Sequence, residues 1–340
     1  MFTLKNKLDK ATCLKRLAAE PFKRVTLSFY RYVRLEHPRE LRDQLFREWS
    51  DLGVFGRIYL AREGVNAQLS VPEPQFEAFK ANLEAREAFK AMPFKIGVEQ
   101  GESFYKLTIK LKKQIVADGL PEDSYDLSQV GKHLSAEEFN QAMEDANTVV
   151  VDMRNFYESK IGHFEGAICP DSNTFKEELP MALDALKGKE DQKVLLYCTG
   201  GIRCEKASAY LKHHGFKDVN QLLGGIIAYK HEVEAKGLES KFKGSNYVFD
   251  ERGSERITAD VLSECDQCDA KWDAYVNCKN ATCNLLFLQC PACSEKWQGA
   301  CSAKCQEVVN MSPEDRKAYY AKQKESTYDI YVSRIRPNLK

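Results

Sequence analysis

The chain has 340 residues, of which 43% are hydrophobic and 29% charged, and its formal net charge at neutral pH is zero. This length predicts two or three domains, and the lack of a long apolar run excludes a membrane-spanning helix. The N-terminal stretch is mixed and polar, so we expect no secretory signal.

The zero net charge conceals a division along the chain. Residues 1–113 hold 22 Lys and Arg against 14 Asp and Glu, whereas residues 114–264 hold 17 against 27. A basic region beside an acidic one allows one domain to hold a polyanion while another modifies it, although charged surface residues usually only interact with water.

The first region alternates strand and helix patterns. We expect strands at 25–34, 56–61, 66–71, 94–98 and 105–110, and helices at 38–51 and 74–89. The β-α-β-β-α-β order predicts a ferredoxin-like (acylphosphatase-like) domain over 1–115, with both helices on one face of the sheet. Arginines interleaved with aromatic residues make it a candidate RNA-binding domain. These residues are Arg24, Arg31, Arg34, Arg57 and Arg62, with Phe29, Tyr30, Tyr32 and Tyr59.

A polar, turn-rich linker at 120–131 separates this domain from a second one, expected over 130–240. Apolar strand patterns at 148–152, 193–197 and 219–223 alternate with helical ones. This alternation predicts a doubly wound parallel sheet covered on both faces. Functional sites in such sheets lie at the carboxyl ends of the strands, where Asp152 and Cys198 stand.

The segment KVLLYCTGGIRCEK runs from an apolar strand into a cysteine, two glycines and an arginine, directly before a helical pattern. Backbone N–H groups and the positive end of a helix dipole favour an anion there, and Arg203 adds positive charge. We therefore expect Cys198 to be a catalytic thiolate nucleophile rather than a cysteine that merely ends a core strand. The expected active-site loop comprises Thr199, Gly200, Gly201, Ile202, Arg203 and Cys204.

Two stretches of this region, VVVDMRNFYESKIGHFEGAI and CTGGIR, resemble the signatures of the rhodanese family. The loop between Cys198 and Arg203 is one residue shorter than in the phosphatases of this fold, which favours persulfide over phosphatase chemistry. Asp152 and Arg154 are supporting residues that either shape substrate access or form an ion pair that holds the fold. Cys204 either resolves a persulfide on Cys198 or, as we favour, caps the following helix.

The last region, expected over 241–340, is organised by four cysteine pairs. They are Cys265 and Cys268, Cys278 and Cys283, Cys290 and Cys293, and Cys301 and Cys305. Eight thiolates suit two closed, structural zinc sites, with iron–sulfur clusters or disulfides as the alternatives. The sequence does not say which pairs combine. Cysteines in these spacings are typical of reducing compartments, so we expect a cytoplasmic location.

Three stretches together are similar to the bacterial tRNA uridine hydroxylase family, rhodanese-related proteins formerly uncharacterised: GRIYLAREGVNAQLSV, YCTGGIRCEKASAYL and the eight-cysteine region. The resemblance implies an oxidoreductase that uses molecular oxygen to form 5-hydroxyuridine at wobble position 34 of tRNA. It also implies that Cys198 is the essential cysteine and that the tRNA anticodon loop is the partner.

Two other functions are open from the residues alone. One is a sulfurtransferase that passes persulfide sulfur from Cys198 to an acceptor, and the other is a non-enzymatic RNA-binding or adaptor protein. There is no Rossmann glycine fingerprint or P-loop, so no organic cofactor is expected.

Overall fold

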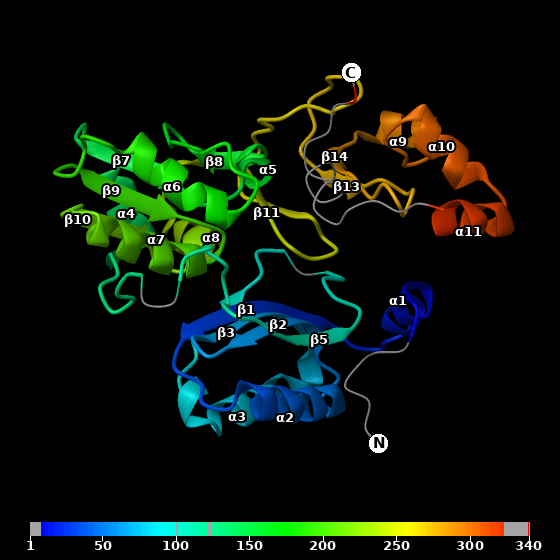
Figure 1. Cartoon of the computed structure of the whole chain (residues 1–340), viewed down its shortest axis with the longest axis horizontal. Helices are drawn as coiled ribbons and strands as arrows, with labels where there is room; N and C mark the ends of the chain where they lie inside the picture. The colour runs from blue at the N-terminus through cyan, green and yellow to red at the C-terminus, as the bar shows by residue number, and fades with distance from the viewer. Residues whose placement is uncertain (1–7, 100, 122–123, 323–338, 340) are drawn as a thin grey trace.

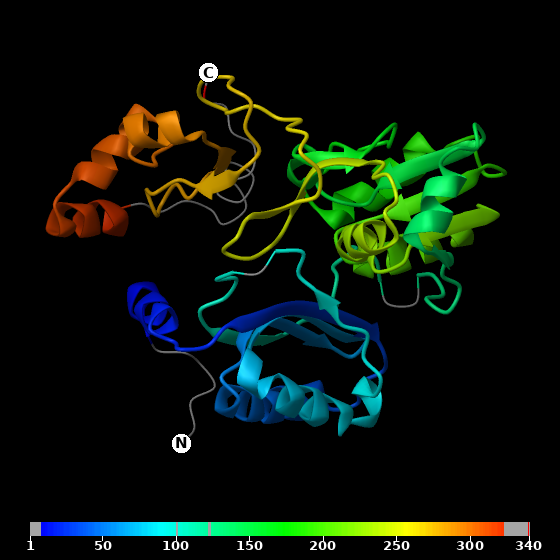
Figure 2. The same cartoon turned by 180° about the vertical axis from the view of Figure 1, so that it is seen from behind.

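The computed structural model describes residues 8–99, 101–121, 124–322 and 339, which form three regions (Figure 1). In both views the N-terminal domain lies below, and the other two regions lie side by side above it (Figures 1 and 2). None of the described helices is long and apolar enough to cross a membrane.

The N-terminal domain has the predicted ferredoxin-like arrangement with one strand added at the edge of the sheet. Its elements are α1 (Lys10–Ala18), β1 (Arg24–Tyr32), α2 (Pro38–Asp51), β2 (Phe55–Ala61), β3 (Gly64–Pro72), α3 (Phe76–Glu84), β4 (Lys95–Ile96) and β5 (Leu107–Leu111). The strand order is β4-β1-β3-β2-β5, antiparallel except where β5 runs parallel to β2.

The helix predicted over 74–89 is shorter than expected. The α-helix ends at Glu84, and a separate 3-10 turn covers Glu87–Phe89. Arg86 between them has extended backbone angles (φ −105°, ψ 124°), which interrupt the helical hydrogen bonds. The break lets Phe89 turn back into the core, where it is fully buried.

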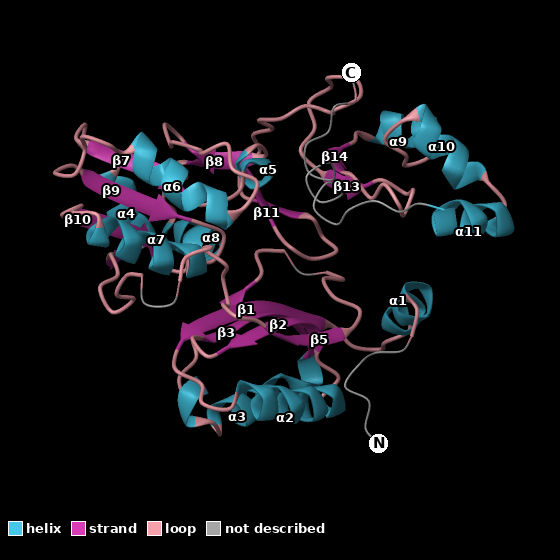
Figure 3. Cartoon of the chain, viewed as in Figure 1, coloured by secondary structure: helices cyan, strands magenta, loops and turns pink. Residues whose placement is uncertain are grey.

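The two faces of the N-terminal sheet differ in composition. Leu27 and Phe29 of β1 pack into a core that includes Trp49 of α2 and Phe79 of α3. Alternate residues of the same strands are polar and face away from the helices, because side chains of a strand alternate between faces. Figure 3 shows both helices on one side and the open face of the sheet turned toward the other two regions.

The second region is the predicted parallel α/β domain. Its elements are β6 (Lys132–Leu134), α4 (Ala136–Ala142), β7 (Thr148–Asp152), α5 (Phe156–Ser159), β8 (Gly162–Phe164), α6 (Phe175–Ala185), β9 (Lys193–Tyr197), α7 (Ile202–His213), β10 (Asp218–Leu222) and α8 (Gly225–Lys236). The main sheet has the order β6-β10-β9-β7, with every pair parallel. Helices α6 and α7 bury apolar side chains on one face, and α4 and α8 do so on the other.

After α8 the chain stays with the second region before it enters the cysteine-rich one. Strand β11 (Phe242–Tyr247) pairs antiparallel with β8 and with β12 (Ser254–Arg256). The cysteine-rich region then contains β13 (Tyr275–Asn277), β14 (Leu286–Leu288), α9 (Pro291–Trp297), α10 (Ala303–Asn310) and α11 (Pro313–Lys322). The domain limits expected from the sequence stay a prediction, and residues 323–338 and 340 of the last expected region lie outside the described residues.

A buried ionic contact joins the first two regions. The Lys206 ammonium of α7 is 1% exposed and lies 3.0 Å from a carboxylate oxygen of Glu63 and 3.0 Å from one of Asp118. Glu63 stands in the turn between β2 and β3, and Asp118 lies in the connection after β5. This contact fixes the open face of the N-terminal sheet against the part of α7 that follows Cys198.

Candidate active site and metal sites

Cys198 directly follows β9, and its side chain is 1% exposed. The backbone N–H of Gly201 donates to its Sγ over 3.1 Å. Gly201 is also the N-cap of α7, with a φ of +95° that L side chains rarely adopt. A Cβ at this position would lie 2.9 Å from the Tyr30 hydroxyl, so both the backbone and the neighbouring domain require glycine here.

Opposing effects set the pKa of the Cys198 thiol. Burial raises this pKa, but a hydrogen bond from Cys204, the charge of Arg203 and the backbone N–H groups of Arg203 and Gly200 outweigh burial. Together they lower the pKa of Cys198 to about 5, whereas burial and the adjacent thiolate keep the pKa of Cys204 well above its usual value. At neutral pH Cys198 is therefore a thiolate, and Cys204 is a neutral S–H donor.

The favoured capping role of Cys204 is wrong. Gly201 occupies the N-cap, and Cys204 lies inside the first turn of α7, fully buried. Its sulfur interacts with Cys198 instead of with free backbone groups. Ile202 and Arg203 likewise begin the helix, so the loop proper consists of Thr199, Gly200 and Gly201.

A glutamate that sequence reasoning missed holds Arg203 in place. The guanidinium donates to both carboxylate oxygens of Glu158, over 2.6 and 2.8 Å, and Glu158 is fully buried. Glu158 belongs to α5, distant in sequence from the active-site loop. The pair keeps a positive charge beside Cys198 in a fixed orientation.

Asp152 and Arg154 form a brace away from the reactive thiolate. The Arg154 guanidinium donates to both oxygens of Asp152, over 2.9 and 2.7 Å, and also to the Gly162 carbonyl over 2.6 Å. Tyr197 donates its hydroxyl to Asp152 over 2.7 Å, and the ion pair is fully buried. Neither residue lines the cavity described next, which favours the role of holding the fold.

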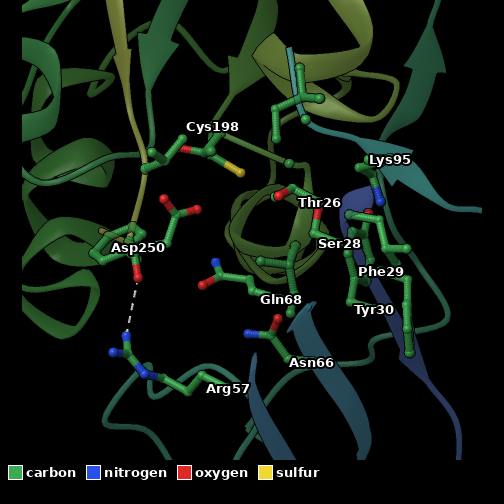
Figure 4. Close-up of a pocket in the computed structure, with 18 of the residues that line it drawn as sticks. Thr26, Ser28, Phe29, Tyr30, Arg57, Asn66, Gln68, Lys95, Cys198 and Asp250 are labelled. Atoms are coloured by element: carbon green, nitrogen blue, oxygen red, sulfur yellow. Dashed lines mark hydrogen bonds between the residues drawn. The ribbon is translucent and has the colours of Figure 1, made fainter. Parts of the chain in front are cut away.

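A cavity of about 310 Å³ lies between the active-site loop and the open face of the N-terminal sheet (Figure 4). Three parts of the chain line it: Cys198 with its loop, strands β1 to β4, and the segment after β11. In Figure 4 the sulfur of Cys198 points into this space, opposite Gln68 and Asn66 of β3. Lys95 of β4 and Asp250 lie on either side.

The predicted RNA-binding residues of the first domain separate into two groups. Arg57, Phe29, Tyr30 and Tyr59 line the cavity. Arg24 instead pairs with Glu20, and Arg31 donates to backbone carbonyls near residue 90.

Three further cavity residues, Asn66, Gln68 and Lys95, were missed by sequence reasoning. The sequence holds a signal for two of them. Asn66, Gln68 and Ser70 alternate with the buried apolar residues of β3, and this period of two marks a polar sheet face.

Tyrosines of β1 hold the first turn of α7. Tyr30 donates its hydroxyl to Glu205 over 2.9 Å, and Tyr32 donates to the Ile202 carbonyl over 3.2 Å. Glu205 also contacts His133 over 2.9 Å and accepts from Gln221 over 3.0 Å. The helix that carries the active-site loop is thus attached directly to the N-terminal sheet.

The eight C-terminal cysteines form two groups of four. Each group has its sulfur atoms within 4.8 Å of one another: Cys265, Cys268, Cys290 and Cys293 in one, Cys278, Cys283, Cys301 and Cys305 in the other. The first pair along the chain therefore combines with the third, and the second with the fourth. All the cysteines are free in the described residues, so the disulfide alternative does not hold.

The sulfur spacing fits a tetrahedral metal ion. Cys268 and Cys290 have their sulfurs 3.6 Å apart, and Cys283 and Cys301 have theirs 3.7 Å apart. A tetrahedron with metal–sulfur bonds of about 2.3 Å has edges of about 3.8 Å. Backbone N–H groups of Cys290 and Cys301 donate to sulfurs of their groups, over 3.4 Å each, as is common around metal thiolates. Each group could hold one metal ion with no open coordination position.

Comparison with known families gives a description for each region. Residues 24–115 match the UPF0176 acylphosphatase like domain, residues 135–232 the rhodanese-like domain, and residues 243–306 the rhodanase C-terminal family. The first two matches agree with the observed ferredoxin-like and parallel α/β architectures.

Curated relatives extend over nearly the whole chain. A protein of Leptospira interrogans is 58% identical over 99% of this chain and 92% of its own length. A protein of Yersinia enterocolitica is 47% identical over 94% of this chain and 91% of its own, and one of Hamiltonella defensa is 46% identical over 93% and 90%. All three are named tRNA uridine(34) hydroxylase. With this identity over almost its full length, the chain belongs to the tRNA uridine(34) hydroxylase family.

Proposed function

We propose that this protein hydroxylates uridine 34 of tRNA at C5 and that Cys198 is the catalytic residue. The family name supplies the reaction. The observation that carries the assignment to Cys198 is its position: a thiolate of lowered pKa opens into a cavity that a second, basic domain completes. We place the reaction in the cytoplasm, where reducing conditions keep such a thiolate free.

The substrate base would enter the cavity unstacked. Enzymes that act on a base take it out of the helical stack, and a base in a loop has the least stacking to lose. The cavity of about 310 Å³ is at the small end of ligand sites, which suits one base rather than a strand. Arg57 at its edge is exposed and suits a phosphate of the anticodon loop.

Addition of the Cys198 sulfur to C6 of uracil would activate C5. The new S–C6 bond moves the electron pair of the C5=C6 bond to C5 and O4, which makes C5 nucleophilic. Reaction of C5 with molecular oxygen, followed by a two-electron reduction by an external dithiol, leaves one oxygen atom on C5 and releases the other as water. Loss of the C5 proton and of the thiolate then restores the ring.

The two four-cysteine groups would each hold a structural zinc ion. Four thiolates without a histidine or an open position suit a site that stabilises the fold, not one that activates water.

The direct test uses the full chain and a tRNA transcript with U34, in air and without oxygen, with and without dithiothreitol. Mass spectrometry of the digested RNA should find 5-hydroxyuridine only when oxygen and reductant are both present. Cys198→Ser should abolish product formation. Cys169 does not line the cavity, so Cys169→Ser is the control and should still form the product. Product formed at full rate by Cys198→Ser would refute the assignment.

A sulfurtransferase is the second candidate, because residues 135–232 match the rhodanese-like domain. The same digests would then contain thiouridine, and intact mass spectrometry of the protein after thiosulfate treatment would find sulfur on Cys198. An RNA-binding adaptor would give neither product.

A further inference from the structure

Lys95 is a cation of the N-terminal domain that reaches the active-site loop of the second domain. A Cβ added at Gly200 would lie 3.7 Å from its Cδ, and one at Gly224 would lie 3.6 Å from its Cε, so the side chain passes over the loop. Its ammonium lies 4.3 Å from the centre of the Tyr30 ring and lines the cavity with Cys198. Within the described residues, the ammonium has no hydrogen-bond or ion-pair partner.

Gln68 is a second polar group without a partner in the same cavity. It rises from β3 toward Cys198, with its carboxamide in open space (Figure 4). Neither end of this carboxamide makes a hydrogen bond in the part of the chain that the structure describes. Its neighbour Asn66 differs, because its amide nitrogen already donates to the Ile115 carbonyl over 3.4 Å.

Resting on the proposed function, we propose that Lys95 and Gln68 determine specificity by reading the hydrogen-bonding edge of uracil, so that the enzyme selects uridine over cytidine. Uracil presents an acceptor, a donor and an acceptor at O4, N3 and O2. The Lys95 ammonium only donates, which suits O4. The Gln68 carboxamide can accept from N3–H while it donates to O2. Cytosine carries a donor amino group at position 4, which would face the donor ammonium without a partner.

A role as a mere counterion of Cys198 is the competing explanation for Lys95. Burial lowers the pKa of Lys95 to about 8, against the charges of Cys198 and Glu205. The amine is therefore mostly charged at pH 7 and keeps its three donors under assay conditions. A counterion role predicts a changed reactivity of Cys198 with an unchanged base preference, whereas a reading role predicts a changed preference.

The test compares the full chain on two tRNA transcripts that differ only in U34 or C34. The readout is the ratio of kcat/KM values for 5-hydroxyuridine and 5-hydroxycytidine formation, by mass spectrometry. Lys95→Gln should lower the wild-type ratio by about 10- to 100-fold, because a carboxamide can accept from an amino group, and Gln68→Leu should lower it similarly. Lys95→Arg should retain most of the preference. Gln44→Leu, an exposed change on α2 on the helix side of the sheet, should leave it unchanged.

A second measurement covers variants that lose turnover on both substrates. Each transcript is tested for protection of Cys198 against iodoacetamide. U34 tRNA should protect wild type at lower concentration than C34 tRNA, and this difference should disappear in Lys95→Gln.

The two proposals fail in different ways. If wild type makes no 5-hydroxyuridine, the proposed function is wrong. Suppose instead that wild type is active. If Lys95→Gln and Gln68→Leu then keep the wild-type ratio of kcat/KM values, or keep the wild-type difference in protection, the inference is overturned and the proposed function stands.

Discussion

Two walls of the cavity, the active-site loop and the open face of the N-terminal sheet, are built in different ways. The loop wall is one continuous segment, from Cys198 to Cys204, whose backbone and first helical turn create the thiolate. The sheet wall gathers residues from four strands of one sheet, spread from Thr26 to Lys95, which face the loop wall only when the two domains dock. The contrast separates reactivity, which is local in sequence, from substrate binding, which depends on tertiary structure.

The largest effect should come from the loop wall. Cys198→Ser should lower the hydroxylation rate by about 10³-fold or more, because a serine hydroxyl does not ionise near neutral pH. Binding of tRNA should stay near the wild-type value, because the sheet wall is intact. A parallel loss of binding, measured by filter retention, would contradict the division between the walls.

Removal of the zinc proposed for the two cysteine groups should affect a third part of the molecule and leave both walls folded. Structural zinc contributes about 10–16 kcal/mol in small metal domains, so chelation should unfold the cysteine-rich region. Tryptophan emission should report this, since Trp272 and Trp297 pack against one cysteine group. Cys265→Ser should lower the metal content from two ions per chain to one, measured by elemental analysis; unchanged content would refute a role of Cys265 as a ligand.

The contact between the walls should be sensitive to Lys206. Lys206→Met leaves the carboxylates of Glu63 and Asp118 without their cation in a buried site, which should cost about 3–5 kcal/mol of unfolding free energy. Urea denaturation measures the loss. Lys217→Met removes an exposed ion pair and serves as the control, for which we expect little change. Equal effects of the two would mean that the domains dock without this contact.

The pH dependence of Cys198 isolates the loop wall. The alkylation rate should rise through a midpoint near pH 5, since the thiolate is the reacting form. Cys204→Ala removes a donor to the thiolate and should move the midpoint to higher pH, whereas Cys204→Ser keeps a donor and should move it less. A wild-type midpoint near pH 9 would exclude the lowered pKa.

The smallest effect is expected on the sheet wall. Arg57→Ala should weaken tRNA binding several-fold and reduce its salt dependence, because one phosphate contact is lost. The alkylation profile of Cys198 should not change. Arg39→Ala on α2, exposed and on the opposite side of the sheet, is the matched control.

The sequence predicted most of the local structure and little of the docking. The order of strands and helices, the parallel sheet and the position of Cys198 were predicted, because each depends on patterns within a few residues. The carboxylate partner of Arg203, Glu158, was not, because it comes from a distant helix. The role of Lys95 could not be predicted from its sequence neighbours, because Lys95 reaches the active-site loop only through the contact between the two domains.

The cysteine region shows the same limit. The eight cysteines and the number of four per group were predictable from spacing. Their interleaved grouping was not, because it depends on how β13, β14 and α9 fold back on one another.

The most direct test of the account is to trap the base on the enzyme. A tRNA with 5-fluorouridine at position 34 has no C5 proton to lose. Addition of the thiolate at C6 is reversible by itself, but once C5 has also reacted with oxygen the thiolate cannot leave together with a C5 proton, so the adduct should persist in air. We predict a protein–RNA adduct that peptide mass spectrometry maps to Cys198 and that is absent in Cys198→Ser. An adduct on another residue, or none under any condition in which this tRNA binds, would contradict the central role of this thiolate.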